Sequence, residues 1–400
     1  MSAGADTTRL PWAMVWLLAI AQIVSWGSLY YSFSFFVLPM QASLGYGLPL
    51  LNGALTVGLL VTGAIAPAVG AYVDRHGARA VMTAGSIAAA LLLLAWSTLE
   101  SAPAFYLVWL GLGATLAAVL YEPAMATVTQ HFGTEARRGI TALTLVAGFA
   151  STVFMPLTQT LLAHFDWRTT LRLLALCHLA IALPIHATCI PRRPPQPPRE
   201  TTSAADTFRP HRHPAFAGLA VWLTANSVVF ATVTFEFVPL MKSRGVAPEL
   251  VMIAVALFGP SQVFGRIVML AGGARITTRS AGTLTTLLMP AAMLILILGP
   301  AQTAGLCLFA FCYGLANGIT TILRGVAPAE LVGTAGYART MGALAVPAMV
   351  AIALSPLAMA SIWRLGGDSA PMLWTAFAWS VAGALGFQHA LRHDKARGVD

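Results

Sequence analysis

Four ionisable side chains lie inside long apolar stretches of the sequence: Glu122, Glu236, Arg266 and Arg324. A charge near the centre of a lipid bilayer costs roughly 2.5 to 3.5 kcal/mol on insertion scales, so each residue needs a partner, a water-filled cavity or a ligand. A buried arginine can bind a carboxylate, and a buried glutamate can carry a proton if it gains and loses that proton near neutral pH. These four residues predict a pathway for an anion, a proton or both.

Two interpretations of Glu122 follow from its surroundings. It lies in the tripeptide Tyr121-Glu122-Pro123, where the proline removes a backbone donor and is expected to bend the helix. The glutamate is either a proton carrier or an ion-pair partner of Arg324. It can have both roles if the ion pair forms in one conformation and breaks in the other. Arg324 lies near the predicted end of its span, so its long side chain can alternatively reach water.

Arg266 and Glu236 are separate candidates. Arg266 precedes Arg275 by nine residues, which places it roughly 13 Å deeper along a helix, where its side chain reaches water less easily. We expect it to bind an anionic substrate. Glu236 lies near the outer end of its span, where it is either a proton acceptor facing a cavity or a solvated residue at the membrane surface.

The elements that position these residues are long apolar helices. The 400-residue chain is 58% apolar and 9% charged, whereas soluble domains are about 25% charged. The mean hydropathy is +0.76. Apolar runs here are longer than the strands of a membrane barrel, which need only about 10 residues. We predict an all-α membrane protein with twelve transmembrane helices, near residues 12–39, 50–73, 80–99, 103–131, 138–163, 168–190, 214–241, 249–271, 278–299, 301–325, 333–361 and 369–391.

The spans are predicted to form two pseudo-symmetric six-helix bundles. Residues 191–213 are rich in proline and arginine, which predicts an extended, solvated cytoplasmic linker with no packed element, between bundles at 1–190 and 214–400. The stretch FSFFVLPM at residues 33–40 resembles TFEFVPLM at residues 234–241, and an offset of 200 pairs Pro39 with Pro239. GLGATLAAVLY from Gly111 resembles GLANGITTILR from Gly314, an offset of 203 that sets Tyr121 opposite Arg324. Two similar offsets across one linker indicate an internal duplication.

The distribution of charge predicts the orientation. With both termini in the cytoplasm, sixteen lysines and arginines fall on the cytoplasmic side, and only five fall outside: Arg168, Arg172, Lys242, Arg244 and Arg364. This asymmetry accounts for the net charge of +9 without a nucleic-acid partner. High arginine content and short loops indicate a multi-pass protein of the bacterial cytoplasmic (inner) membrane. The four cysteines lack C-x-x-C spacing, so we predict no metal site, and we predict no cofactor.

A motif between the second and third spans resembles a family signature. The chain reads Gly70-Ala-Tyr-Val-Asp74-Arg75-His-Gly77-Ala78-Arg79, similar to the G-x-x-x-D-R-x-G-R-[RK] pattern of the major facilitator superfamily, with Ala78 in place of a basic residue. With the twelve spans and the central linker, the resemblance covers the whole chain and implies secondary transport by two rocking halves. The motif implies a conformational clamp in which Asp74 meets a helix N-terminus and Arg75 a carboxylate. Its members are Gly70, Asp74, Arg75, Gly77 and Arg79.

The eighth span resembles the monocarboxylate-porter branch of that superfamily. It reads Gly259-Pro-Ser-Gln262-Val-Phe-Gly265-Arg266, where the branch has an aspartate four residues before the arginine. Gln262 occupies the aspartate position. The resemblance implies that Arg266 binds the carboxylate of the substrate, while the acid that would accompany it is absent from this span.

The resemblance also adds neutral candidates for substrate binding. Spans one, four, seven and ten line the central cavity in this superfamily, which implicates, together with Arg324, the residues Gln22, Trp26, Tyr30, Tyr121, Asn226 and Asn317. Each alone is more often a packing residue.

The predicted function is a proton-coupled, alternating-access carrier of a small, monocarboxylate-like organic anion. Its predicted partners are that small molecule, protons and the lipid bilayer, and the protein is expected to be a monomer. Arg266 would bind the anion, and Glu122 or Glu236 would carry the proton. The alternative is proton-antiport export of drugs or toxic metabolites through an aromatic pocket. No H-E-x-x-H or G-x-S-x-G motif occurs in the sequence, so we do not predict an enzyme.

Overall fold

Twelve long apolar helices build the computed structural model, which describes residues 12–191, 209–298 and 303–393. All twelve are long and apolar enough to cross a bilayer, and the described residues contain no strand. The first six spans consist of α1 (Trp12–Trp26), η1 (Gly27–Tyr31), α2 (Phe33–Leu44), α3 (Leu48–His76), α4 (Ala78–Trp96), α5 (Ala102–Val119), α6 (Tyr121–Phe132), η2 (Gly133–Glu135), α7 (Ala136–Ala147), α8 (Ala150–His164), α9 (Trp167–Cys177), η3 (His178–Ala182) and α10 (Leu183–Thr188). The last six consist of η4 (Pro210–Arg212), α12 (Pro214–Ser243), α13 (Pro248–Gly272), η5 (Gly273–Arg275), α14 (Thr278–Leu298), α15 (Thr303–Leu331), α16 (Tyr337–Gly366) and α17 (Ala370–Arg392).

The predicted spans are confirmed, and most helix ends differ by only a few residues. The largest difference concerns the tenth span, which was predicted to end at residue 325 but continues through Pro328 to Leu331. Val326, Ala327 and Leu331 are buried in a core shared with the first six spans. Burial of these apolar residues extends the helix beyond the point at which the sequence suggested a break.

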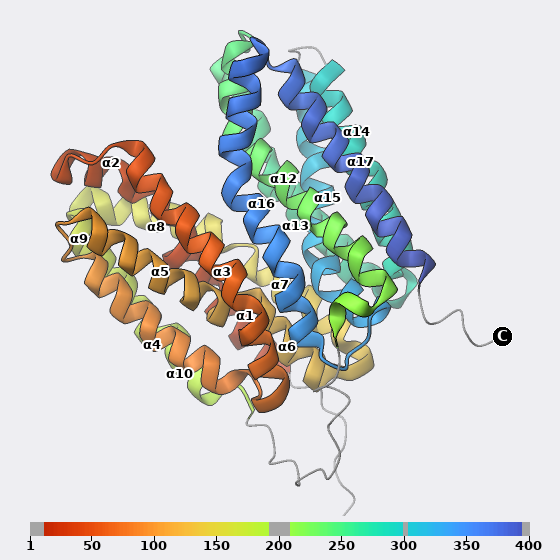
Figure 1. Cartoon of the computed structure of the whole chain (residues 1–400), viewed down its shortest axis with the longest axis horizontal. Helices are drawn as coiled ribbons and strands as arrows, with labels where there is room; N and C mark the ends of the chain where they lie inside the picture. Colours follow the sequence, from red (N-terminus) through yellow and green to blue (C-terminus); the bar gives the residue numbers. More distant parts are fainter. Residues whose placement is uncertain (1–11, 192–208, 299–302, 394–400) are drawn as a thin grey trace, which may run out of the picture.

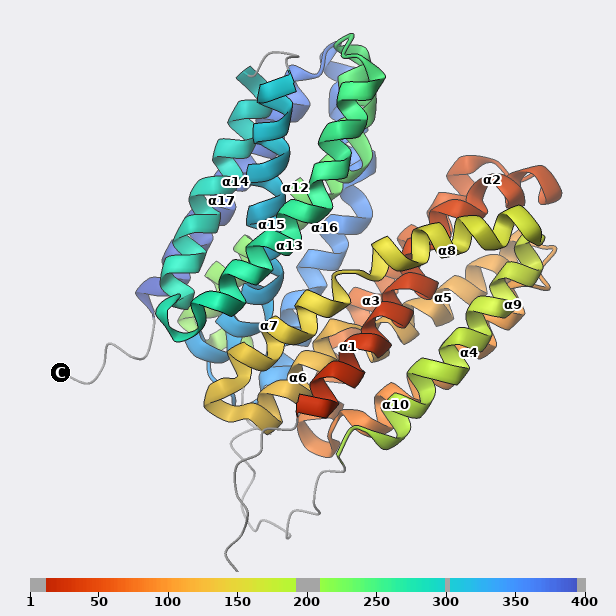
Figure 2. The same cartoon turned by 180° about the vertical axis from the view of Figure 1, so that it is seen from behind.

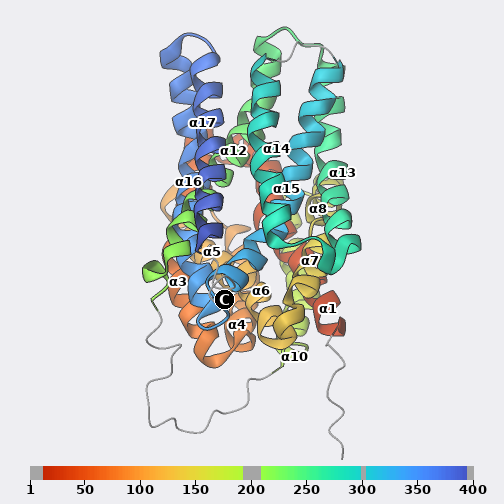
Figure 3. The ribbon, with the colours of Figure 1, turned by 90° about the vertical axis from the view of Figure 1, so that its right-hand side faces the viewer.

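The helices form two bundles, one from α1 to α10 and the other from α12 to α17 (Figures 1 and 2). A side view shows α12 to α17 running next to one another as one bundle (Figure 3). The predicted linker lies largely outside the described residues. Its last part corrects the prediction of an unpacked segment, because Pro210–Arg212 forms a 3-10 turn whose Pro210 is buried. We call the end of the molecule where α10 ends and α12 begins the linker end.

The two bundles share their main hydrophobic core towards the linker end, and a smaller cluster of Leu59, Met349 and Ala353 joins α3 to α16. One core cluster joins residues of both bundles, among them Met125 and Ile140 from the first and Ile322 and Val326 from the second. Two further clusters each belong to one bundle alone. The bundles therefore pack together at the linker end and diverge towards the opposite end (Figure 1).

The largest contact between the bundles joins α3 to α16, and it depends on small residues. A side chain at Gly70 would overlap the carbonyl of Ala338, and one at Gly342 would overlap the carbonyl of Ala66. Small residues let helix backbones approach closely, which favours packing where lipid offers no hydrophobic driving force.

Asp74 stabilises the contact between α3 and α16 at the linker end. Its two carboxylate oxygens accept hydrogen bonds from the backbone N–H groups of Ala338 and Arg339, at 2.9 and 2.8 Å. These groups belong to the first turn of α16, where N–H groups lack partners within the helix and favour a negative charge. The predicted contact of Asp74 with a helix N-terminus is therefore present. Gly77, which separates α3 from α4, has φ 81° and ψ 166°, a conformation that a residue with a side chain rarely adopts.

Candidate functional site

The fourth span is broken next to Glu122. α5 ends at Val119, Leu120 is extended with φ −84° and ψ −155°, and α6 begins at the next residue. Pro123 offers no N–H group to the carbonyl of Val119, four residues earlier. The side-chain amide of Gln22 donates instead, at 2.7 Å from the Val119 oxygen and 3.3 Å from the Leu120 oxygen. As a result, Glu122 lies in the first turn of α6, where the helix dipole favours its negative charge.

Glu122 forms an ion pair with Arg324 that joins α6 of the first bundle to α15 of the second. Their side chains are only 14% and 20% exposed, so each charge depends on the other for compensation. The internal duplication had set Tyr121 opposite Arg324, one residue away from the pair that forms. The ion-pair interpretation of Glu122 holds in this conformation, and a proton-carrying role in another conformation stays a prediction.

Arg266 reaches from α13 of the second bundle into a break in the fifth span. α7 ends at Ala147, α8 begins at Ala150, and the guanidinium of Arg266 lies against Gly148 between them, where a side chain would otherwise be. Arg266 is 5% exposed, and its Nε has no hydrogen-bond partner. Within the three described ranges no carboxylate pairs with it. Its guanidinium lies at the C-terminus of α7, where the helix dipole favours a positive charge, and its unpaired Nε leaves donor capacity for an anionic ligand.

Because Arg266 lies against Gly148, adding one methyl group at position 148 is predicted to displace the guanidinium. In Gly148→Ala the new Cβ would occupy the position of the guanidinium, and the flexible arginine side chain would move away. We expect the protein to fold with an unchanged melting temperature, while the KM for an anionic substrate rises about tenfold or more because the arginine is displaced.

Gly259→Ala is the matched control for this prediction. Gly259 lies in the same helix as Arg266, and a Cβ there meets no other atom within 4 Å. Transport kinetics and thermal unfolding of both variants check the prediction, and equal KM values in the two would refute it.

An aromatic cluster lies next to Arg266. Trp26 contacts Tyr30, Tyr31 and Tyr121, with ring centroids 5.5, 6.0 and 5.2 Å away, and Tyr30 and Tyr31 are 5.4 Å apart. Arg266 lies within electrostatic range of the hydroxyl groups of Tyr31 and Tyr121. Of the predicted substrate-binding residues, Trp26, Tyr30 and Tyr121 are thus brought together, with Arg266 in electrostatic range of Tyr121.

Sequence reasoning missed Tyr31, which belongs to the same cluster. Gly27–Tyr31 forms a π-helical turn within the first span, and such turns are frequent at functional sites. The wider turn allows the adjacent rings of Tyr30 and Tyr31 both to contact Trp26. The pair of adjacent tyrosines in the sequence was the available signal, but the π-helical turn could not be seen there.

Two of the neutral candidates make hydrogen bonds within one bundle, and their role in substrate binding stays a prediction. Gln22 is completely buried, and its amide donates to the backbone carbonyls at the break in the fourth span. Asn226 donates to the carbonyl of Trp222 and lines a small space between α12, α14 and α17, inside the second bundle. Periodicity placed both residues on the right helices, but the faces on which they lie depend on packing within each bundle.

The remaining candidates have less distinctive surroundings. Asn317 is partly buried, and its Nδ2 has no partner within the described residues. Glu236 is partly buried in α12. Arg75 is exposed and Arg79 is partly buried, both near Asp74 at the linker end. The two glycines of the tenth span, Gly314 and Gly318, lie so close to the backbone of α13 that a Cβ at either position would overlap it.

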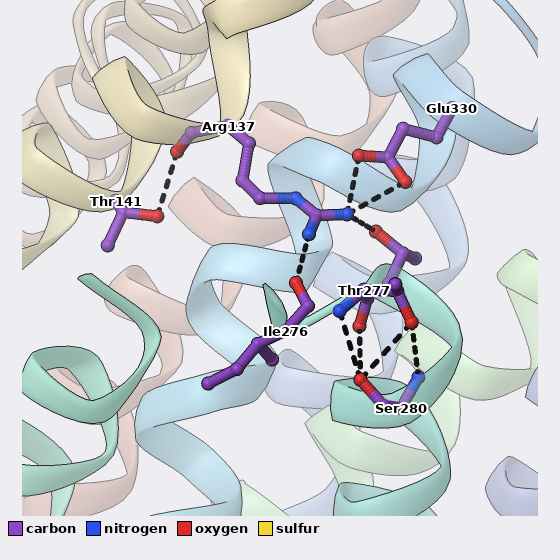
Figure 4. A network of polar contacts seen from close by, with 7 residues as sticks. Arg137, Thr141, Ile276, Thr277, Ser280 and Glu330 are labelled. Atoms are coloured by element: carbon purple, nitrogen blue, oxygen red, sulfur yellow. Dashed lines mark hydrogen bonds and ion pairs between the residues drawn. The ribbon is translucent and has the colours of Figure 1, made fainter. Parts of the chain in front are cut away.

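Arg137 forms a third polar link between the bundles, one that the sequence did not single out (Figure 4). From α7 it donates to the carbonyl of Ile276, to the hydroxyl of Thr278 at 2.7 Å, and to both carboxylate oxygens of Glu330 at 2.7 and 3.0 Å. All three partners belong to the second bundle. Charge counting alone had treated Arg137 as a residue that sets the membrane orientation.

We expect loss of the Arg137 link to favour separation of the bundles at the linker end. Because Glu330 is 42% exposed, the ion pair itself contributes about 1 kcal/mol or less, and the two further hydrogen bonds add to it. Arg137→Ala should raise hydrogen exchange in residues 326–331 and 338–342 by about two- to tenfold. Arg138→Ala serves as the control, since Arg138 pairs only with Glu135 of its own bundle.

Comparisons with known proteins agree with this architecture. Residues 18–356 match the family model of the Major Facilitator Superfamily. The chain belongs to the major facilitator superfamily. It is therefore a membrane transporter of a small molecule and not an enzyme. Its assignment to the monocarboxylate-porter branch stays a prediction.

Relatives of this superfamily member are distant. An uncharacterised transporter of the same superfamily, YcxA of Bacillus subtilis strain 168, is 25% identical over 209 residues, 50% of this chain and 49% of YcxA. The chain thus matches only about half the length of this curated relative. The human organic anion transporter MFSD10 has a similar structure, with a TM-score of 0.67 at 19% identity, covering 95% of this chain and 98% of MFSD10. The transporter FucP in an outward conformation also has a similar structure. Its TM-score is 0.74 at 14% sequence identity, and the match covers 96% of this chain and 99% of FucP. At these identities the likeness concerns the fold.

Proposed function

We propose that this superfamily member carries a small organic anion of the monocarboxylate type across the bacterial cytoplasmic membrane. The observation that carries the proposal is Arg266, a buried cation between the two bundles that no carboxylate of the described residues neutralises. A desolvated guanidinium without a partner is costly, and a carboxylate supplies the planar pair of acceptors that fits it. The name of MFSD10, an organic anion transporter, agrees with this substrate class on the same fold.

Alternating access follows from the contacts at the linker end. We infer that both termini are cytoplasmic, so the closed end faces the cytoplasm and the substrate enters from the other side. The motif residues Gly70, Asp74, Arg75, Gly77 and Arg79 would stabilise the closed state, with Asp74 bound to the start of α16. Opening towards the cytoplasm would separate these contacts and release the substrate. The protein is proposed to act as a monomer.

Proton coupling is proposed to depend on Glu122. Its partner Arg324 belongs to the other bundle, so separation of the bundles would leave the carboxylate without its cation. A carboxylate that loses a buried partner binds a proton more readily. Glu122 would therefore gain a proton in one conformation and lose it in the other. Glu236 remains the second candidate for this role. FucP, named as a fucose:proton symporter, shows that proton coupling occurs on this fold.

Export of drugs or toxic metabolites by proton antiport is the alternative. The aromatic cluster around Trp26 favours it, because flat rings bind many apolar compounds. In that case Glu122 would exchange protons against the drug, and Arg266 would have only a structural role.

Proton flux into proteoliposomes separates the two functions. Vesicles that hold the protein and a pH-sensitive dye are challenged with a panel of monocarboxylates, then with cationic and neutral drugs. Proton movement that requires a monocarboxylate supports the proposal. No response to any acid, together with proton movement on addition of drugs, would overturn it in favour of antiport.

A further inference from the structure

We propose that the transported anion has a flat aromatic body, which binds to the rings of Trp26, Tyr30, Tyr31 and Tyr121 while its carboxylate binds Arg266. This inference rests on the proposed function and narrows its substrate to aromatic monocarboxylates. It is carried by a cluster of four aromatic rings, two of which, Tyr31 and Tyr121, lie close enough to the buried cation of Arg266 to interact with it electrostatically.

The four rings lie where the two bundles meet. Tyr30 packs against the cluster of Leu59, Met349 and Ala353, which joins α3 of the first bundle to α16 of the second. Tyr121 begins α6, directly before Glu122 and its partner from α15. Trp26, Tyr30 and Tyr31 all retain partial exposure to solvent. A ligand between the bundles can therefore reach these rings.

The polar atoms around the rings favour an anion over a cation. The indole Nε1 of Trp26 and the Nε of Arg266 are both buried donors without partners, and neither atom can accept a hydrogen bond. Glu122, the acid next to Tyr121, is already paired with Arg324. The site thus offers unused donors and, within the described part of the chain, no unused carboxylate near the rings, which complements the acceptor atoms of a carboxylate.

The arrangement of the rings favours an aromatic body over an aliphatic one of the same size. Tyr30 is nearly perpendicular to Trp26, at 84°, whereas Tyr31 and Tyr121 are tilted against it by 36° and 46°. Rings at different tilts present both faces and edges, and aromatic pairs gain from face-to-edge and offset contacts beyond the area that they bury. Four such rings make an aromatic ligand preferable to a saturated ring.

Binding of three matched probes to the purified full-length protein tests the inference. Benzoate, cyclohexanecarboxylate and benzamide have similar size, and differ in the aromatic ring or in the charge. We expect benzoate to bind about two- to tenfold more tightly than cyclohexanecarboxylate in calorimetry, and benzamide not to bind measurably. Equal or tighter binding of cyclohexanecarboxylate would overturn the aromatic inference and leave the proposed function intact. Failure of both carboxylates to bind, with proton flux driven by smaller monocarboxylates, would likewise overturn the aromatic inference alone, whereas no response to any acid of the panel would reject the proposed function itself.

Two variants assign the preference to the rings. Trp26→Leu should bring benzoate and cyclohexanecarboxylate to similar affinities, while Trp26→Phe should retain the preference for benzoate. Trp374→Leu is the control, because Trp374 is 48% exposed on α17 and away from the cluster. A preference that survives in Trp26→Leu and also in Tyr31→Leu would contradict the assignment.

Discussion

Replacing Arg266 with glutamine is expected to abolish substrate-dependent proton flux without loss of folded protein. The substitution removes a charge that has no carboxylate partner among the described residues, so the melting temperature should stay the same or rise. Substrate binding loses charge-assisted hydrogen bonds of about 1.5 to 3 kcal/mol, which is roughly 10- to 150-fold in affinity. Arg266→Lys keeps the charge but lacks the planar fork, and should give an intermediate affinity.

The control for this experiment is Arg364→Gln. Arg364 is exposed near the end of α16, away from the linker end, and should leave flux unchanged. Flux and thermal unfolding measured on all three variants in the same vesicles give the result. Normal transport by Arg266→Gln would remove Arg266 from the substrate site and with it the main support for an anionic substrate.

The second large effect is expected from Glu122 and Arg324. Glu122→Gln leaves Arg324 mostly buried without its partner, a loss of roughly 2 kcal/mol after allowance for partial exposure. Because the pair joins the two bundles, this energy should shift the ratio of closed to open molecules at the linker end by about thirtyfold. Distances between spin labels on α4 and α14 at the linker end report that ratio directly.

The double variant Glu122→Gln with Arg324→Gln separates the two interpretations of Glu122. It removes both charges, so the closed state should largely recover. If Glu122 is only an ion-pair partner, proton-coupled transport recovers with it. If Glu122 carries the proton, the closed state recovers but substrate movement no longer moves protons. Loss of the closed state in the double variant would contradict the role of the ion pair itself.

The helices of this protein could be predicted from the sequence, because lipid requires long apolar segments whose backbone groups pair internally. The contact of Asp74 with a helix N-terminus was also predicted, since the motif fixed both the acid and the turn. The internal duplication set Tyr121 opposite Arg324, and the residue that pairs with Arg324 is Glu122, one position further along the chain. These features depend on local sequence or on symmetry.

The sequence could not show which neighbour each side chain of a helix contacts. The amide of Gln22 donates a hydrogen bond to the carbonyl of Val119, which Pro123 leaves without a donor. This hydrogen bond forms only because the first and fourth spans pack together. The π-helical turn at Gly27–Tyr31 changes the register of the first span and brings Tyr31 to the cluster. Arg137 binds three groups that lie about 140 and 193 residues away in the sequence. Each of these features arises from packing between spans.

The close contact of α3 with α16 has a consequence for the speed of transport. Where Gly70 and Gly342 meet backbone atoms of the opposite helix, neither residue has a side chain that must move when the helices separate. Packing at these two positions therefore adds little friction to the movement. Separation also breaks the shared hydrophobic core and the polar contacts of Asp74, Arg137 and Glu122, and of these the polar contacts depend on single side chains. Turnover can accordingly be tuned by single substitutions at these residues, without redesign of the interface.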